Sequence, residues 1–100
     1  PASAQNGTQV LFANFGEEYA LLCNQMIKTL RDHKIRSEFY PDAAKMKKQF
    51  SYANAKNIPL LVVIGPDERA NNSFVLKDMD SGTQTSHAFD QFLETIHTAL

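Results

Sequence analysis

The sequence feature that most constrains the fold is the apolar run from Leu60 to Ile64, within the stretch IPLLVVIG. Pro59 precedes the run and Gly65 follows it, as expected at the two ends of a strand. A bilayer requires roughly 20 apolar residues, so this run is too short to cross one. A short and nearly continuous apolar run is typical of a β-strand covered on both faces. We therefore expect a sheet with helices on both sides and no contact with a membrane.

The segments before this run alternate between strand and helix patterns. Residues 8–15 and 36–40 are rich in β-forming side chains, and each predicts a short strand. Apolar residues recur at helical spacing from 17 to 33 and predict a helix between these strands. A second helix is predicted to begin at an N-cap, Asp42, and to stop near Asn57. Two successive strand–helix–strand units imply parallel strands joined by right-handed crossovers.

After Gly65 the pattern changes. Residues 66–72 have the composition of a turn, 73–78 and 83–87 predict a hairpin, and 89–100 predict a closing amphipathic helix. The sequence thus predicts one α/β domain of three layers, with the order β-α-β-α-β-β-β-α and a mixed sheet of about five strands. The small polar residues 1–8 are expected to form a linker, and 9–100 the domain, as an excerpt of a longer protein.

Charge is unevenly distributed along the chain. The net charge is only −1, which argues against binding to nucleic acid through bulk charge. Between residues 28 and 56, however, eight basic residues face three acidic ones, a local balance of +5, and the remainder carries −6. This asymmetry fits one positive surface that could lie along phosphates, or a pair of solvated helices. Charge alone does not decide between the two interpretations.

Catalytic and metal-binding motifs are not visible in the sequence. The single cysteine, Cys23, lies on the apolar stripe of the first predicted helix and suits a buried position in a reducing cytoplasm. His33, His87 and His97 do not have the spacing of a metal site. The stretch FGEE at 15–18 does not have the composition of a phosphate-binding loop. We therefore expect no catalytic residue, metal or cofactor within this domain.

Several short motifs together resemble one family. They are K-x-K-K-Q followed by YA, the IP that enters the apolar run, G-x-x-E, and V-x-K-x-M-x-S-G in the hairpin. With these motifs, residues 9–100 resemble the anticodon-binding domain of class IIa aminoacyl-tRNA synthetases, most closely the C-terminal domain of histidyl-tRNA synthetases. The resemblance implies the mixed α/β fold of that domain and a tRNA as its partner.

The resemblance also implies a parent enzyme, a cytoplasmic homodimeric histidine–tRNA ligase that uses ATP and Mg²⁺ in an upstream catalytic domain. Neither a membrane nor DNA is expected as a partner. Another class IIa synthetase, for threonine, proline or glycine, is an alternative. A protein-interaction module on the same fold is a second alternative. A flavodoxin-like enzyme is a third, with the missing phosphate loop against it.

The resemblance assigns RNA-binding roles to individual residues. Glu68, in G-x-x-E, matches a glutamate that faces an anticodon base, and its two oxygens suit the N1–H and N2 amino groups of guanine, as in the anticodon GUG. Lys77 matches a basic position directed at the same loop. The amide of Gln49 is expected at the edge of the core stripe, within reach of base edges. Lysines of the second helix are expected to neutralise phosphates: Lys45, Lys47 and Lys48.

Each of these roles has a structural alternative. Glu68 could end a turn, Lys77 could be a solvated strand residue, and Gln49 could cap a backbone group. Tyr40 could be a stacking platform for a base or a half-buried aromatic at a strand end, and Arg69 is included because it adjoins Glu68. Pro66 departs from the family pattern, since another residue usually follows the glycine, and it should stiffen the segment that holds Glu68.

Overall fold

The computed structural model describes residues 7–100, so residues 1–6 of the expected linker lie outside the described part. Its five strands form one sheet in the order β2-β1-β3-β4-β5. The first three strands are parallel, and the last two form an antiparallel hairpin beside them. The strands are β1 (Val10–Phe12), β2 (Ser37–Phe39), β3 (Leu60–Val63), β4 (Ser73–Asp78) and β5 (Gln84–Ala88). The predicted mixed five-stranded sheet is confirmed.

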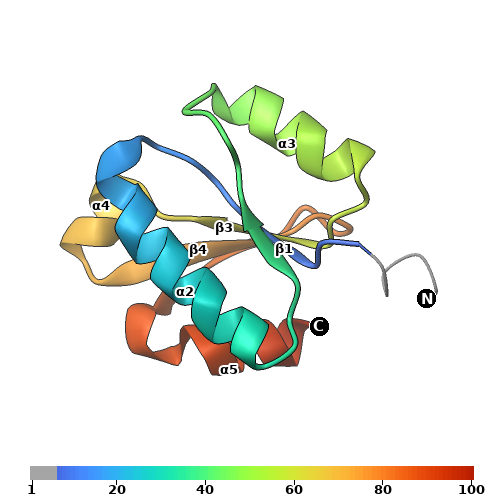
Figure 1. Cartoon of the computed structure of the whole chain (residues 1–100). Coiled ribbons are helices and arrows are strands. Elements are labelled where there is room, and N and C mark those ends of the chain that lie inside the picture. The colour runs from blue at the N-terminus through green and yellow to red at the C-terminus, as the bar shows by residue number, and fades with distance from the viewer. Residues whose placement is uncertain (1–6) are drawn as a thin grey trace.

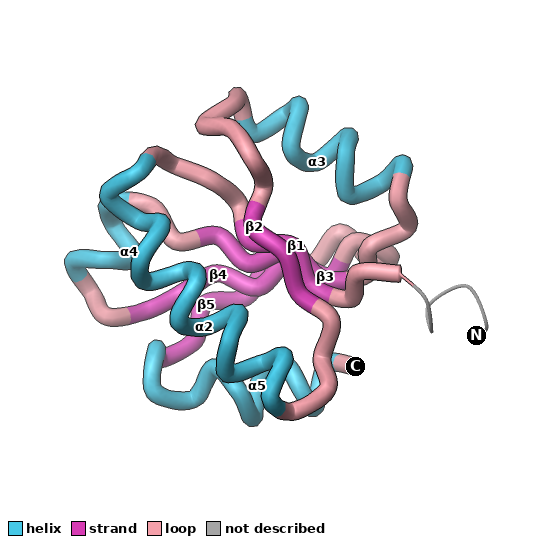
Figure 2. The backbone as a smooth tube through the Cα atoms, viewed as in Figure 1, coloured by secondary structure: helices cyan, strands magenta, loops and turns pink. Residues whose placement is uncertain are grey.

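Helices cover both faces of this sheet (Figure 1). One face packs against a 3₁₀ turn η1 (Glu17–Tyr19), helix α2 (Ala20–Asp32) and helix α5 (Phe92–Ala99), which follows a second 3₁₀ turn, η2 (Phe89–Gln91). Helix α3 (Met46–Ala55) lies on the opposite face. Figure 2 shows the strands as a band between these two groups of helices. The three-layer α/β architecture is therefore as predicted.

Successive side chains of a strand point to opposite faces of the sheet, and this divides the core into two clusters. Val10, Phe12 and Val62 contribute to the cluster under α2 and α5, whereas Leu11 and Leu61 contribute to the cluster under α3. Side chains of β3 therefore enter both clusters, and Leu60, Leu61 and Val62 are at most 2% exposed. This explains why the sequence of β3 is continuously apolar, since a strand covered on both faces has no polar side.

The boundaries of two helices differ from the prediction. Asp42 is not the N-cap of the second helix, because α3 begins at Met46 with Lys45 at the N-cap position. Residues 66–70, expected as a turn, form a short helix α4 (Pro66–Ala70), which adds a helix to the predicted three. Pro66 occupies its first turn, where the absence of an N–H costs nothing. The side chain of Glu68 accepts a hydrogen bond from the Gly65 N–H at 2.8 Å.

The ends of α2 and α3 share one backbone motif. A left-handed residue follows each helix, Lys34 with φ 65° and Asn57 with φ 56°. The next N–H then bonds back across six residues, from Ile35 to the Leu30 carbonyl and from Ile58 to the Ala53 carbonyl, both at 2.9 Å. The predicted stop near Asn57 is confirmed. Of the helices in residues 7–100, none is long and apolar enough to cross a membrane.

Candidate nucleic-acid interface

A buried group of hydrogen bonds fixes the beginning of α3 against the end of β1. The Gln49 side-chain oxygen accepts from the Asn14 N–H at 2.8 Å, and its Nε2 donates to the Asn14 carbonyl at 3.0 Å and to the Ala44 carbonyl at 2.8 Å. The Asn14 side chain donates to the Tyr40 carbonyl at 2.9 Å. Backbone groups from three segments therefore depend on two amide side chains, and this arrangement fixes where the first turn of α3 lies.

This geometry corrects two of the expected RNA contacts. Gln49 is fully buried and its amide is already bonded on both sides, so it does not lie at a surface where it could reach a base. Its structural alternative, the capping of backbone groups, is what the structure shows. Tyr40 is 6% exposed and packs edge-on against Tyr52 with ring centroids 5.3 Å apart. Tyr40 is therefore a core residue and not a stacking platform.

The first turn of α3 presents a group of lysines to solvent, which we call the α3-start cluster: Lys45, Lys47 and Lys48. All three side chains are exposed, and none has an acidic partner among residues 7–100. The positive end of the helix dipole lies at the same place, with its first N–H groups. Within the described chain, no side chain caps those groups. Positive charge and open backbone donors together suit an anionic ligand such as a phosphate.

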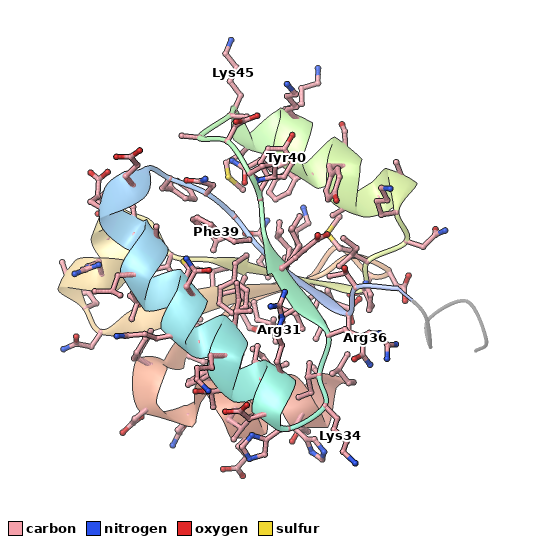
Figure 3. The ribbon with its side chains drawn as sticks, viewed as in Figure 1. Arg31, Lys34, Arg36, Phe39, Tyr40 and Lys45 are labelled. Carbon is pink, nitrogen blue, oxygen red and sulfur yellow. The ribbon has the colours of Figure 1, made fainter. Side chains whose placement is uncertain are left out.

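Three other basic residues lie away from this cluster, so the basic residues between 28 and 56 do not all form one positive surface. Figure 3 shows Lys45 and Lys34 at opposite ends of the molecule, with Arg31 and Arg36 between them along β2. We call the basic residues between the last turn of α2 and the start of β2 the α2-end cluster: Arg31, Lys34 and Arg36. Arg31 donates to the Ser37 carbonyl from Nε at 3.2 Å and from Nη2 at 2.9 Å. Ser37 belongs to β2, an edge strand of the sheet, so Arg31 covers part of that edge.

Lys77 lies on β4 and reaches toward α3. Its ammonium group is 4.1 Å from the centroid of the Phe50 ring, and both side chains are half-buried. This contact places Lys77 on the same side of the sheet as the α3-start cluster. Its interpretation as a freely solvated strand residue is therefore too simple, because a cation–π contact holds its head group.

Glu68 and Arg69 lie on α4 and contact the other helical layer. The half-buried Glu68 lines a hollow of about 190 Å³ together with Leu22 and Phe89. Arg69 donates to the Glu18 carbonyl at 3.4 Å, and its guanidinium carbon lies 5.9 Å from the Tyr19 ring centroid. The structure therefore does not bring Glu68 and Lys77 into one group, since their contacts are with different layers of the domain.

The sequence did not indicate the contacts of three residues that matter here. Asn14 lies two residues after the end of β1, and a polar residue near a strand end was the available signal. Phe50 has the spacing of a core residue in α3, and the sequence does not indicate that its ring contacts Lys77. The Tyr52 hydroxyl donates to Glu38 at 3.1 Å, and desolvation, followed by this bond, raises the pKa of Tyr52. A hydroxyl with a raised pKa stays neutral beside the α3 lysines.

Reactive and metal-binding chemistry has little support in the described chain. Burial raises the pKa of the Cys23 thiol to about 11, although the charge of Arg69 acts in the opposite direction. Such a thiol is protonated and unreactive at neutral pH. Within residues 7–100, no three His, Cys, Asp or Glu side chains come together in a way that could hold a metal ion.

Comparison with known proteins places this geometry in a family. The model of a family described as the anticodon binding domain matches residues 9–98, nearly the whole chain. The chain belongs to the anticodon-binding domain family. A solved histidyl-tRNA synthetase from Nostoc sp. PCC 7120 superimposes on 93% of this anticodon-binding domain with a TM-score of 0.86 and 28% identity. The fold and the predicted family resemblance are thus confirmed together.

Curated relatives of this anticodon-binding domain are histidine–tRNA ligases. The Bacteroides fragilis protein is 50% identical over 84 residues, which cover 84% of this chain and 18% of that protein. The Phocaeicola vulgatus protein is 41% identical over 96 residues, which cover 96% of this chain and 21% of that protein. The chain therefore spans about a fifth of the length of these relatives, and 22% of the Nostoc chain.

Proposed function

We propose that this domain binds the anticodon loop of a histidine tRNA, with the α3-start cluster on the backbone phosphates. The observation that carries the proposal is the placement of three exposed lysines, without acidic partners in residues 7–100, at the positive end of a helix. Such a placement disfavours the isolated fold, and it becomes favourable when an anion binds. Membership in the anticodon-binding domain family supports RNA as the source of that anion.

We propose that Glu68 recognises a base of the anticodon loop. One of its oxygens accepts from the Gly65 N–H, which fixes the carboxylate at the first turn of α4. A carboxylate accepts from the N1–H and N2 amino groups of guanine and offers nothing equivalent to adenine. Arg69 and Lys77 are proposed to contribute phosphate contacts from α4 and β4.

The parent protein is proposed to be a cytoplasmic, homodimeric histidine–tRNA ligase that consumes ATP with Mg²⁺. The names of the curated relatives support this proposal. The relatives' names describe whole proteins, of which this chain spans about a fifth, so we assign the steps of that reaction to the rest of the parent protein. Its own contribution would be to select the tRNA and orient it.

A salt titration with an anticodon stem-loop tests the phosphate contacts. We expect Lys47→Gln/Lys48→Gln to weaken binding and to reduce the slope of log K against log salt by about 1.4, or about 0.7 for each contact to unpaired RNA. The matched control is Lys28→Gln/Lys34→Gln, which removes the same charge from α2 and from the second residue after it. Equal slopes for the two double variants would refute the proposal that Lys47 and Lys48 contact phosphates.

A second titration tests base reading. Stem-loops with GUG, or with each guanine changed to adenine, are compared with the wild-type chain and with Glu68→Gln. The substitution keeps an oxygen that can accept from Gly65 but removes the carboxylate, so the fold should remain intact. We expect a preference for GUG that largely disappears in the variant. The same preference in both chains would refute the assigned role of Glu68, and no binding at any salt concentration would favour the protein-interaction alternative.

A further inference from the structure

In the contact between Phe50 and Lys77, a charged group covers one face of an aromatic ring. Phe50 packs from α3 against the cluster that contains Leu11 and Leu61 and remains half-buried. One face of its ring carries the Lys77 ammonium group, at 4.1 Å from the centroid. A flexible side chain with a well-hydrated charge therefore occupies a position that tightly packed carbon would occupy in a closed core.

The sheet beside this pair is open on the α3 side. The register of the hairpin pairs Lys77 with Gln84 and Val75 with Ser86, so all four residues belong to one face of β4 and β5. Gln84 and Ser86 are exposed, and Val75 is half-buried. Figure 1 shows α3 over one face of the sheet, and the contact of Lys77 with Phe50 places these four residues on that face. An aromatic ring thus stands at the border of a polar strand surface with amide and hydroxyl groups.

We propose that Phe50 is a stacking platform for an unpaired base of the bound RNA, and that Lys77 is the latch that covers the ring until RNA arrives. This inference rests on the proposed function and adds to it the position of one base. On binding, the ammonium group would leave the ring and pair with a phosphate of the same strand, while a base takes its place against Phe50. No covalent bond forms or breaks.

Physical chemistry favours this exchange. A phosphate carries a full negative charge, and it attracts an ammonium group more strongly than the quadrupole of a phenyl ring does. A base offers a flat π-face, and stacking on aromatic side chains is a common way in which proteins hold unpaired nucleotides. Since every base has such a face, Phe50 would contribute affinity rather than sequence preference. Sequence reading would then remain with Glu68.

The test uses anticodon stem-loops in which 2-aminopurine replaces one loop base at a time. In the wild-type chain we expect strong fluorescence quenching on binding at one loop position, as stacking on a ring produces. Phe50→Leu should abolish that quenching and weaken binding about tenfold, whereas Phe50→Tyr, which keeps the aromatic face, should retain both. Binding of an RNA duplex of equal length, which offers no unpaired base, should be the same for all three chains.

A substitution of Lys77 separates its role from that of Phe50. Lys77→Met removes the charge but leaves Phe50 in place, so the quenching should persist while the salt slope falls by about 0.7. If Phe50→Leu fails to fold, contacts between base protons and ring protons in the NMR spectrum of the wild-type complex answer the same question. Binding of the loop without quenching at any position, or without such contacts, would overturn the inference and leave the proposed function standing. No binding by the wild-type chain would overturn both.

Discussion

The two basic clusters of this domain lie at opposite kinds of helix end. The α2-end cluster lies at a C-terminus, where the helix dipole is negative and basic side chains stabilise the fold. The α3-start cluster lies at an N-terminus, where each lysine costs about 0.3–1 kcal/mol. Arg31 is bonded to a carbonyl, whereas the α3 lysines have no acidic partners within residues 7–100. The comparison teaches that basic residues of similar type stabilise the fold at one helix end and disfavour it at the other, which is why we propose a ligand role only for the α3-start cluster.

The largest effect is expected from removing the side chain that holds the α3-start cluster in place. Gln49→Leu leaves the Asn14 N–H, the Asn14 carbonyl and the Ala44 carbonyl without their partners in a buried region. We expect the free energy of unfolding to fall by about 3 kcal/mol or more, measured by urea denaturation. The control is Gln25→Leu on the exposed face of α2, which should change it by less than about 0.5 kcal/mol.

The same charge reversal, made once in each cluster, tests the contrast between the two helix ends. Lys47→Glu places an acidic side chain at the positive end of α3 and should raise the free energy of unfolding by about 1 kcal/mol. Lys34→Glu, just beyond the negative end of α2, should lower it by a similar amount. In RNA titrations, the first variant should bind about tenfold more weakly, and the second within about twofold of the wild type. Changes of the same sign in both stabilities would contradict the contrast between the clusters.

A smaller effect concerns the backbone that carries Lys34. Its φ of 65° is unfavourable for a side chain with a Cβ, and helices usually place glycine there. Lys34→Gly relieves that conformation but loses a favourable charge, so we expect a net stabilisation of about 0.5 kcal/mol in thermal and urea denaturation. Asn57→Gly, at the matching position after α3, is the control. Because asparagine tolerates this conformation, its gain should be smaller.

The smallest expected effect on stability at neutral pH comes from the thiol of Cys23. This residue belongs to the cluster under α2, on the opposite side of the sheet from α3. Burial raises the pKa of the thiol to about 11 from a usual value near 9. The folded state therefore holds its proton more strongly, and this contribution to stability is complete below pH 9 and disappears as the pH rises toward 11. At pH 7.5, alkylation should proceed only through unfolding and should respond to urea accordingly. Fast alkylation of the native chain would show that α2 opens locally.

The fold was largely predictable because its signals are local. The apolar run of β3 and the helical periodicity of 17–33 and 89–100 each depend on which side of an element is buried. The prediction failed at Asp42 because the hydrogen bonds of Gln49 and Asn14 hold the preceding segment out of the helix. It failed at 66–70 because turn composition also suits a helix of one turn, once Glu68 bonds to Gly65.

The binding surface was predictable only in part. Lysines of an amphipathic helix are recognisable as exposed, and the structure places Lys45, Lys47 and Lys48 in solvent. Gln49 and Tyr40 were misplaced because periodicity assigns a residue to a face of an element but does not show what the opposite segment presents to it. The contact of Lys77 with Phe50 joins β4 to α3, and nothing in either segment alone indicates it.

The sequence by itself determined the α/β class, the order of the elements and the presence of an excess of positive charge between residues 28 and 56. Only the tertiary structure divided that charge between the end of α2 and the beginning of α3, and it alone placed Gln49 in the core. The reason is physical. Backbone propensity and burial patterns act over a few residues, whereas electrostatics and hydrogen bonding depend on which segments the folded chain brings together.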